Sequence, residues 1–178
     1  MASTSVREHE ALELAVFKAK GQGVRYSIVS RCKEHLSIDS MSGVLSAKNT
    51  LDHEDFSECP VFVIATKFLD NKPLSTITKI LIKIVDINDN SPIFDQQLYH
   101  FNITENSGPT RIGDVHASDA DSGDNAKLYY EIVGGDKNHE FMITENGEIE
   151  TIRDLDRETQ AEYHLIVEAI DGGKPRRR

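Results

Sequence analysis

The chain has 178 residues, with 20 lysines and arginines against 30 aspartates and glutamates, which gives a formal net charge of −10. Nucleic acids and anionic membranes are bound chiefly through lysine and arginine, so this charge disfavours both as partners. No apolar run approaches the ~20 residues that span a bilayer, and no apolar signal segment follows Met1. If the protein is secreted or membrane-bound, we expect this chain to be an excised part of it.

Short strands are predicted along the whole chain. Apolar and polar residues alternate in several runs, and Gly, Pro, Asn, Asp or Ser interrupts each run after a few residues. In chain order, the predicted strands are 11–20, 24–29, 36–38, 61–65, 75–85, 128–133 and 163–169. Many short strands separated by turn residues are typical of β-sandwiches, so the sequence predicts an all-β protein.

An internal repeat divides the chain. Leu51-Asp52-His53-Glu54 matches Leu155-Asp156-Arg157-Glu158, and a glycine lies eight residues before each motif, at Gly43 and Gly147. The period is about 100 residues, long enough for each copy to have its own core. We therefore expect two homologous domains in tandem.

The predicted join is the segment 86–92. Its polar residues follow directly after a strand, and Pro92 prevents a sheet from continuing through it. The predicted domains are 1–90, with the linker at 86–92, and 93–178. The second domain is expected to lack its last strand, because the chain ends before a counterpart of 75–85.

Two segments are rich in oxygen ligands. Asp86-x-Asn88-Asp89-Asn90 lies in the linker, and Asp119-x-Asp121-x-Gly123-x-Asn125 lies in the second domain. Calcium takes six to eight oxygen ligands from carboxylates, amides and carbonyls, so these segments predict calcium binding. The alternative is that their residues only form turns.

Two other kinds of site fit less well. An EF-hand loop beginning at Asp119 needs glycine at its sixth position and glutamate at its twelfth, where this chain has Asp124 and Tyr130. A hydrolase with paired carboxylates, such as Asp52 with Glu54, remains a distant alternative. No nucleophile elbow or phosphate-binding loop accompanies these carboxylates, so we expect no enzymatic activity.

Together, the motifs at 86–94, 119–125 and 155–158, with Ala169-Ile170-Asp171, resemble the extracellular repeats of cadherins. The resemblance covers nearly the whole chain. It implies two tandem Greek-key antiparallel β-sandwiches of the cadherin-like, immunoglobulin-like kind, the second one lacking its last strand. It also implies about three calcium ions at the junction between the repeats.

The resemblance assigns the metal ligands by position. Three of them are expected to bind through backbone carbonyls: Ile87, Asn90 and Asn125. The full implied set is Glu8, Asp52, Glu54, Asp86, Ile87, Asn88, Asp89, Asn90, Asp119, Asp121, Asn125 and Asp171. Half of a further calcium junction is implied at Glu105, Asp156 and Glu158.

The function implied is calcium-dependent cell–cell adhesion or recognition, in which calcium stiffens the junction between the repeats. The expected partner is another cadherin, homophilic or heterophilic, and the expected location is the extracellular face of the plasma membrane, in a membrane-anchored parent protein. The chain has no tryptophan, which disfavours adhesion by exchange of a strand anchored by Trp. The alternative is a non-adhesive spacer or receptor segment that binds a heterophilic ligand.

Two smaller features remain, of which only the first depends on the resemblance. In this topology Cys32 and Cys59 fall at the end of the third strand and the start of the sixth, which allows either a disulfide or two free thiols. Asn102-Ile103-Thr104 is an N-glycosylation sequon, expected on a strand beside Glu105.

Overall fold

The computed structural model describes residues 2–7, 13–20 and 22–178. The chain separates into two compact units, unit 1 (Met1–Ile87) and unit 2 (Asn88–Arg178). In the described residues the only helix is a single 3₁₀ turn, η1 (Lys33–His35), and all other regular structure is strand. No helix in the described part of the chain is long and apolar enough to cross a membrane. The all-β prediction is confirmed.

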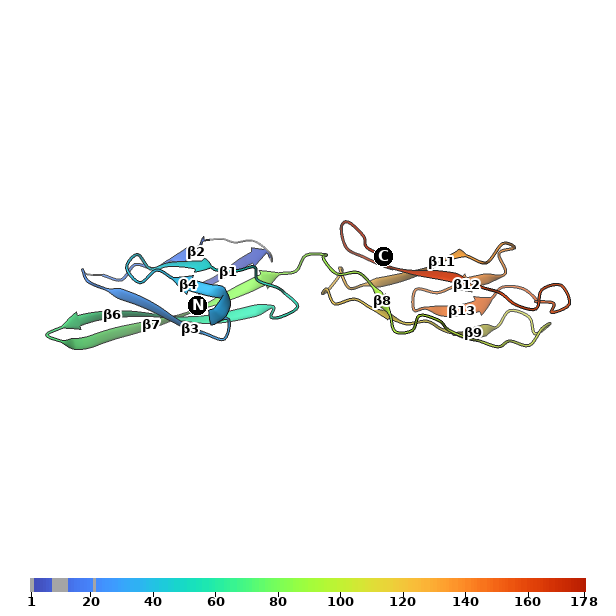
Figure 1. Cartoon of the computed structure of the whole chain (residues 1–178), viewed down its shortest axis with the longest axis horizontal. Coiled ribbons are helices and arrows are strands. Elements are labelled where there is room, and N and C mark those ends of the chain that lie inside the picture. The colour runs from blue at the N-terminus through green and yellow to red at the C-terminus, as the bar shows by residue number, and fades with distance from the viewer. Residues whose placement is uncertain (1, 8–12, 21) are drawn as a thin grey trace. The chain divides into compact units, whose positions relative to one another are not determined.

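Unit 1 contains two sheets, which Figure 1 shows as facing layers. The first has the order β1–β7–β6–β3, with strands at Ala2–Arg7, Lys72–Val85, Glu58–Leu69 and Arg25–Ser30. The second has the order β2–β5–β4, with strands at Glu13–Val16, Val44–Ala47 and Leu36–Ile38. In the described residues of unit 1, strands β1 and β7 pair in parallel, and all other strand pairs are antiparallel. Because β1 and β7 lie far apart in the chain, no tight turn forces them to be antiparallel.

The core of unit 1 follows from strand alternation. In β7 the side chains of Ile80, Ile82 and Ile84 are buried, while Lys83 and Val85 between and after them are exposed. Successive side chains of a strand point to opposite faces, so one face of β7 covers the core. One face of β6 covers the core in the same way, through Val61, Val63 and Ala65. The cluster also includes Leu36, Leu45 and Leu51.

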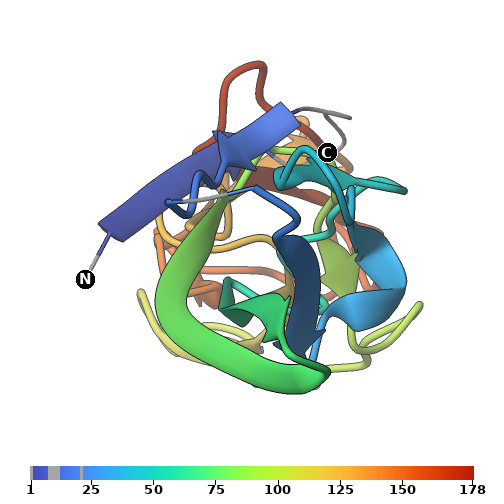
Figure 2. The same cartoon turned by 90° about the vertical axis from the view of Figure 1, so that its left-hand side faces the viewer.

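The strands β6 and β7 form a long hairpin that curves along one side of unit 1 (Figure 2). Its two turn residues, Asp70 and Asn71, have positive φ angles of 48° and 60°. Two successive residues of this kind are typical of the tight turns that match the right-handed twist of paired strands. The turn therefore sets the register along the whole hairpin.

Cys32 and Cys59 are joined by a disulfide, with their Cα atoms 6.1 Å apart. Ser30 pairs with Val61 across β3 and β6, so the next residues along these strands bring the two cysteines together. Both cysteines are buried in the core of unit 1. The sequence separation is 27 residues, and a closed loop of this size stabilises the folded state by roughly 3 to 4 kcal/mol in the chain-entropy model.

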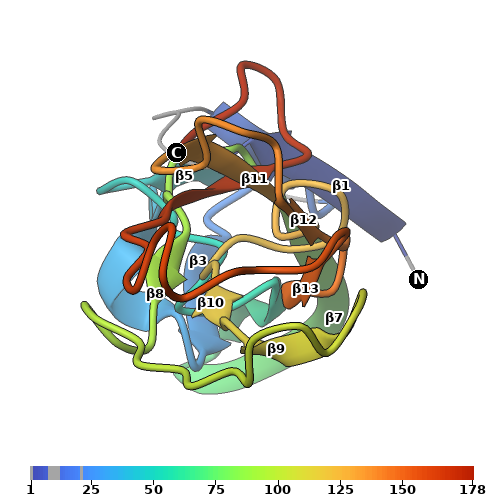
Figure 3. The same ribbon diagram turned by 90° about the vertical axis from the view of Figure 1, so that its right-hand side faces the viewer.

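Unit 2 is built from shorter strands. β11 (Leu128–Gly134) pairs with β14 (Ile166–Asp171), and β8 (Ile93–Phe94) pairs with β10 (Ala117–Ser118). Figure 3 shows the third sheet, of order β12–β13–β9, formed by Phe141–Ile143, Glu148–Thr151 and Arg111–Asp114. The core cluster of unit 2 contains Val115, Phe141, Ile149 and Leu155.

Several strand bounds differ from the predictions. The predicted strand 11–20 is limited to Glu13–Val16 in the described residues, and the predicted strand 163–169 begins only at Ile166. Tyr163 still packs on the core before the strand begins, because alternation fixes the facing of a side chain but not its backbone pairing.

The segment around Asn102 is not a strand, so the prediction that the sequon falls on one is wrong. In unit 1 the corresponding strand β1 bonds to β7. In the described residues of unit 2 no strand follows β14, so this segment has no partner to bond to. Asn102 itself is exposed.

Candidate metal centre

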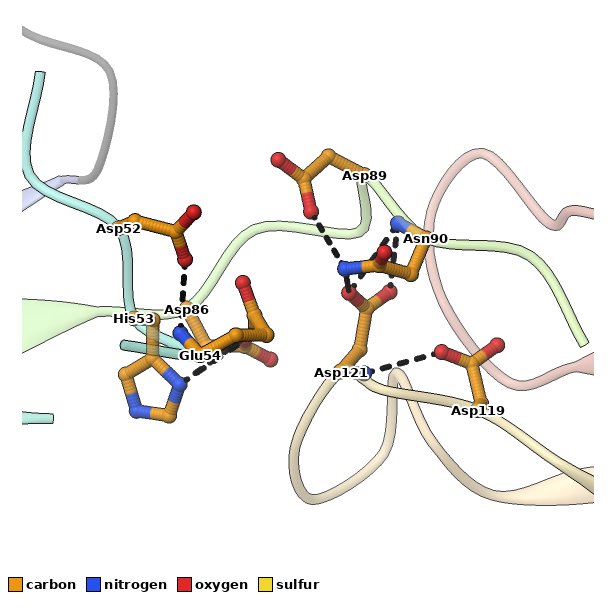
Figure 4. A network of polar contacts seen from close by, with 8 residues as sticks. All are labelled: Asp52, His53, Glu54, Asp86, Asp89, Asn90, Asp119 and Asp121. Carbon is orange, nitrogen blue, oxygen red and sulfur yellow. Dashed lines mark hydrogen bonds and ion pairs between the residues drawn. The ribbon is translucent and has the colours of Figure 1, made fainter. Parts of the chain in front are cut away.

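In unit 1, acidic residues gather where β7 ends. Leu51 is buried in the core and anchors the loop that follows it. The Asp52 carboxylate accepts the backbone N–H of Glu54 at 2.9 Å, which fixes a tight turn (Figure 4). The Glu54 and Asp86 carboxylates lie 3.6 Å and 3.4 Å from Nδ1 of His53. Three predicted ligands of unit 1 are therefore positioned by one buried leucine and one strand end.

In unit 2, the linker residues contact the loop after β10. The backbone N–H and the side-chain Nδ2 of Asn90 both donate to Asp121 Oδ1, at 3.1 Å and 2.7 Å (Figure 4). The same Nδ2 lies 2.9 Å from Asp89 Oδ1. The backbone N–H of Asp121 donates in turn to Asp119 Oδ1 at 3.0 Å. The carboxylates of Asp89 and Asp121 are thus held at one linker amide, and that of Asp119 is held at the backbone of Asp121.

Asp171 is the most enclosed carboxylate of unit 2, with no solvent-exposed surface. It accepts three hydrogen bonds, from Nδ2 of Asn88 at 3.0 Å and from the backbone N–H groups of Gly173 and Arg177 at 2.9 Å each. These donors supply the hydrogen bonds that a buried carboxylate requires. The linker residue Asn88 is therefore tied to the end of β14.

Three buried side-chain oxygens in unit 2 lack hydrogen-bond partners in the described part of the chain: Oδ1 of Asp114 and two oxygens of predicted ligands. The two on predicted ligands are Oδ1 of Asn88 and Oδ2 of Asp119. An unsatisfied buried acceptor costs roughly 1–3 kcal/mol, so a structure rarely retains one without a use for it. Both atoms are hard oxygen donors among carboxylates, which is the ligand chemistry that calcium prefers. The residues present therefore fit a calcium ion.

Known proteins resemble this chain in sequence. The family model for the cadherin domain matches residues 99–178. The chain is 67% identical to Cadherin-3 of Caenorhabditis elegans over 99% of its length, and 35% identical to human Protocadherin Fat 4 over 96%. It spans only 5% and 4% of these two relatives.

Solved structures of cadherin repeats have the same fold as this chain. The chicken VE-cadherin EC1-2 structure superposes with a TM-score of 0.78 at 29% identity, covering 95% of this chain and 88% of that one. The Protocadherin GammaB4 extracellular domain superposes with a TM-score of 0.83 at 27% identity, covering 98% of this chain and 32% of that one. The chain belongs to the cadherin superfamily. Cadherin repeats are non-enzymatic adhesion domains and typically bind calcium, so the prediction of no enzymatic activity is confirmed.

The cadherin ligand set predicted from sequence is divided between the units. Unit 1 holds Asp52, Glu54, Asp86 and Ile87, and unit 2 holds Asn88, Asp89, Asn90, Asp119, Asp121, Asn125 and Asp171. Glu8 lies outside the described residues. Asn125 closes the turn after Asp121 by donating its backbone N–H to the carbonyl of Ser122 at 3.1 Å.

The predicted half-site also forms a cluster in this cadherin repeat. The carboxylates of Glu105, Asp156 and Glu158 lie within 4.8 Å of one another. Repulsion from Glu105 raises the pKa of Glu158 above its ordinary value. Hydrogen bonds from Thr159, and from the backbone of Glu158, lower the pKa of Asp156. The cluster therefore stores like-charge repulsion at neutral pH.

The sequence reasoning missed three residues of this site. A Cβ atom on Gly173 would lie 2.2 Å from Cγ of Asn88, so only glycine leaves room for that amide. Arg177 Nε donates to the Asn88 carbonyl at 2.9 Å. His53 occupies the position that Arg157 has in the second repeat. The sequence did contain a signal for Gly173. Two glycines follow Asp171, and glycine is common where two chain segments approach closely.

Proposed function

We propose that this cadherin chain is a calcium-dependent cell-adhesion or recognition module. The observation that carries the proposal is the pair of buried oxygens, Asn88 Oδ1 and Asp119 Oδ2, which have the chemistry of calcium ligands and no hydrogen-bond partner in the described residues. Bound calcium supplies positive charge that these acceptors and the neighbouring carboxylates need.

The proposed ligand set is the one predicted from sequence, with about three ions at the linker 86–92 between repeats 1–90 and 93–178. Eight of its members are carboxylates, which repel one another when no cation is present. They are Glu8, Asp52, Glu54, Asp86, Asp89, Asp119, Asp121 and Asp171. We therefore expect the linker to loosen without calcium and to stiffen with it.

The proposed location is the extracellular face of the plasma membrane, in a longer membrane-anchored protein. Extracellular calcium modules bind the ion at about 10⁻⁴–10⁻³ M, a range in which extracellular calcium fills the sites and cytosolic calcium does not. The disulfide between Cys32 and Cys59 is consistent with an oxidising compartment. The exposed side chain of Asn102 makes this sequon accessible to glycosylation.

Small-angle scattering of the chain in millimolar calcium and in chelator tests the proposal. We expect a more extended and less variable particle with calcium, and identical profiles would contradict it. Asp119→Asn should reduce the response, whereas Asp124→Asn, in the same loop but outside the predicted ligand set, should leave it unchanged. Aggregation of coated beads then separates an adhesive module, which clusters beads in calcium, from a spacer segment, which does not.

A further inference from the structure

One face of unit 1 exposes apolar side chains over three neighbouring strands. Alternation directs Val61, Val63 and Ala65 of β6 into the core, and so turns Phe62, Ile64 and Phe68 outwards. In β7 it turns Ile77 outwards, and in β3 Val29. Solvent reaches 40% of Phe62, 61% of Phe68, 63% of Ile77 and 57% of Val29. We call these five outward residues, with the strands that carry them, the β3–β6–β7 face.

Strand register makes four of these five side chains neighbours on one continuous apolar surface. Val29 lies opposite Phe62, and Ile64 lies opposite Ile77. Phe62 and Ile64 are neighbours on the same side of β6, which joins the two pairs. Figure 1 shows β3, β6 and β7 side by side in one layer of unit 1. Large contiguous apolar patches are uncommon on soluble proteins and mark interaction sites.

The β3–β6–β7 face is basic, although the chain as a whole is acidic. Register and alternation place Arg25, Lys79 and Lys83 on this face, with Glu58 as the single carboxylate. Lys83 lies 3.8 Å from Glu58, and Nζ of Lys79 lies 5.7 Å from the centre of the Phe62 ring. Three cations and one carboxylate give a net charge of +2, against −10 for the chain. Two copies of this face would therefore repel each other.

A surface of the opposite charge exists on unit 2. The outer side of the sheet β12–β13–β9 exposes Met142 and Ile152, of which solvent reaches 42% and 43%. Glu150 lies opposite Met142, and Glu148 lies opposite Asp114. Arg111 is the cation of this surface, and it forms ion pairs with Asp114 and with Glu148.

Three carboxylates and one guanidinium give this second surface a net charge of −2. We call it the β9–β12–β13 face. It has apolar side chains beside a net charge opposite in sign to that of the β3–β6–β7 face. Such complementarity steers association and fixes which surfaces meet.

We propose that the β3–β6–β7 face of one copy of this chain binds the β9–β12–β13 face of a second copy. The inference rests on the proposed adhesive function and specifies its partner and its surface. Phe62 and Ile77 bury apolar area against Met142 and Ile152, and Lys79 meets Glu150 at the rim. Contact between two different faces is heterologous, so it links copies into a closed ring or an open chain.

Sedimentation equilibrium of the full chain in calcium tests the inference. We expect reversible self-association of the wild type. Lys79→Glu and Glu150→Lys should each weaken it at least about tenfold, because each puts like charges across the contact. An equal mixture of the two variants should recover association, since each variant keeps the intact face that the other needs, and the two reversed faces also complement each other. Lys137→Glu and Glu34→Lys make the same charge changes at exposed positions off both faces and serve as matched controls.

The outcomes are separable. A wild type that remains monomeric at all concentrations overturns the inference, and so do variants that behave as their controls or a mixture that shows no recovery. In the monomeric case the β3–β6–β7 face serves a different acidic protein. Scattering of Lys79→Glu with and without calcium is measured alongside, because failure of the calcium response would refute the proposed function and leave the association result standing by itself.

Discussion

The side-chain amide of Asn88 donates to the buried carboxylate of Asp171 at 3.0 Å. This bond uses the amide nitrogen and leaves the amide oxygen, Oδ1, buried without a hydrogen-bond partner in the described part of the chain. The orientation of an asparagine amide is thus set by the carboxylate beside it. A linker residue and the end of β14, which lie 83 residues apart, therefore leave one buried oxygen available to the proposed calcium ion.

Gly173 keeps this asparagine in place, so Gly173→Ala is the sharpest test of the arrangement. The added Cβ would lie 2.2 Å from Cγ of Asn88 and must displace the amide. We expect calcium affinity, measured by titration calorimetry, to fall about tenfold, since one oxygen ligand is lost. Gly134→Ala is the matched control, because its Cβ would come no closer than 3.2 Å to Ile166. Equal affinities for wild type and Gly173→Ala would refute the role of Gly173.

Asp119→Asn separates charge from shape at the second buried oxygen. The substitution keeps the acceptor of the bond from the Asp121 N–H but removes a negative charge. Calcium affinity is tuned by the number of charged ligands, so we expect it to fall by a factor of ten or more. Thermal unfolding in chelator should change by only a few degrees, because a repelling charge is removed as well. A large drop of the unfolding temperature in chelator would instead indicate a structural role for this carboxylate.

The disulfide of unit 1 should stabilise that unit without affecting calcium. Cys32 and Cys59 are both buried, and Ser30 Oγ lies 3.2 Å from the sulfur of Cys59. Replacing both cysteines by alanine should lower the free energy of unfolding by about 3 to 4 kcal/mol. Denaturant unfolding would measure this loss, with a larger m-value, because the unfolded chain exposes more surface without the cross-link. Calcium affinity should equal that of the wild type, and a drop would show that the two sites are coupled.

Alternation and motif spacing predicted the parts of the fold that depend on local side-chain chemistry. The buried face of β7 followed from Ile80, Ile82 and Ile84, because burial repeats every second residue in a strand. Asp119 and Asp121 were placed with the linker through motif resemblance, and the structure brings Asn90 into contact with Asp121. These features are encoded within a few neighbouring residues.

Features that depend on distant partners could not be predicted in this way. The parallel pairing of β1 with β7 depends on which edge is open after the sheet has formed. The late start of β14 at Ile166 depends on where β11 ends, at Gly134. The fit of Gly173 against Asn88 joins residues far apart in the chain, and no local pattern specifies that distance.

The cluster of Glu105, Asp156 and Glu158 makes the stability of unit 2 depend on pH. Repulsion from Glu105 raises the pKa of Glu158 above its model-peptide value of 4.5. A group whose pKa is higher in the folded state contributes stability that is fully present below 4.5 and is lost as pH rises through the raised pKa. Without calcium, unit 2 should therefore lose stability over that interval.

Glu105→Gln removes the repelling charge and keeps an oxygen that can accept the backbone N–H of Arg157, which now donates to Glu105 at 3.0 Å. We expect the pKa of Glu158, followed by carboxyl NMR in the absence of calcium, to return towards 4.5, its unperturbed value. The pKa of Asp156 should remain lowered, because its main cause is the hydrogen bond from Thr159. An unchanged pKa for Glu158 would mean that Asp156, and not Glu105, is the source of the repulsion. The same variant should bind less calcium at this cluster, since fewer carboxylates remain to attract it.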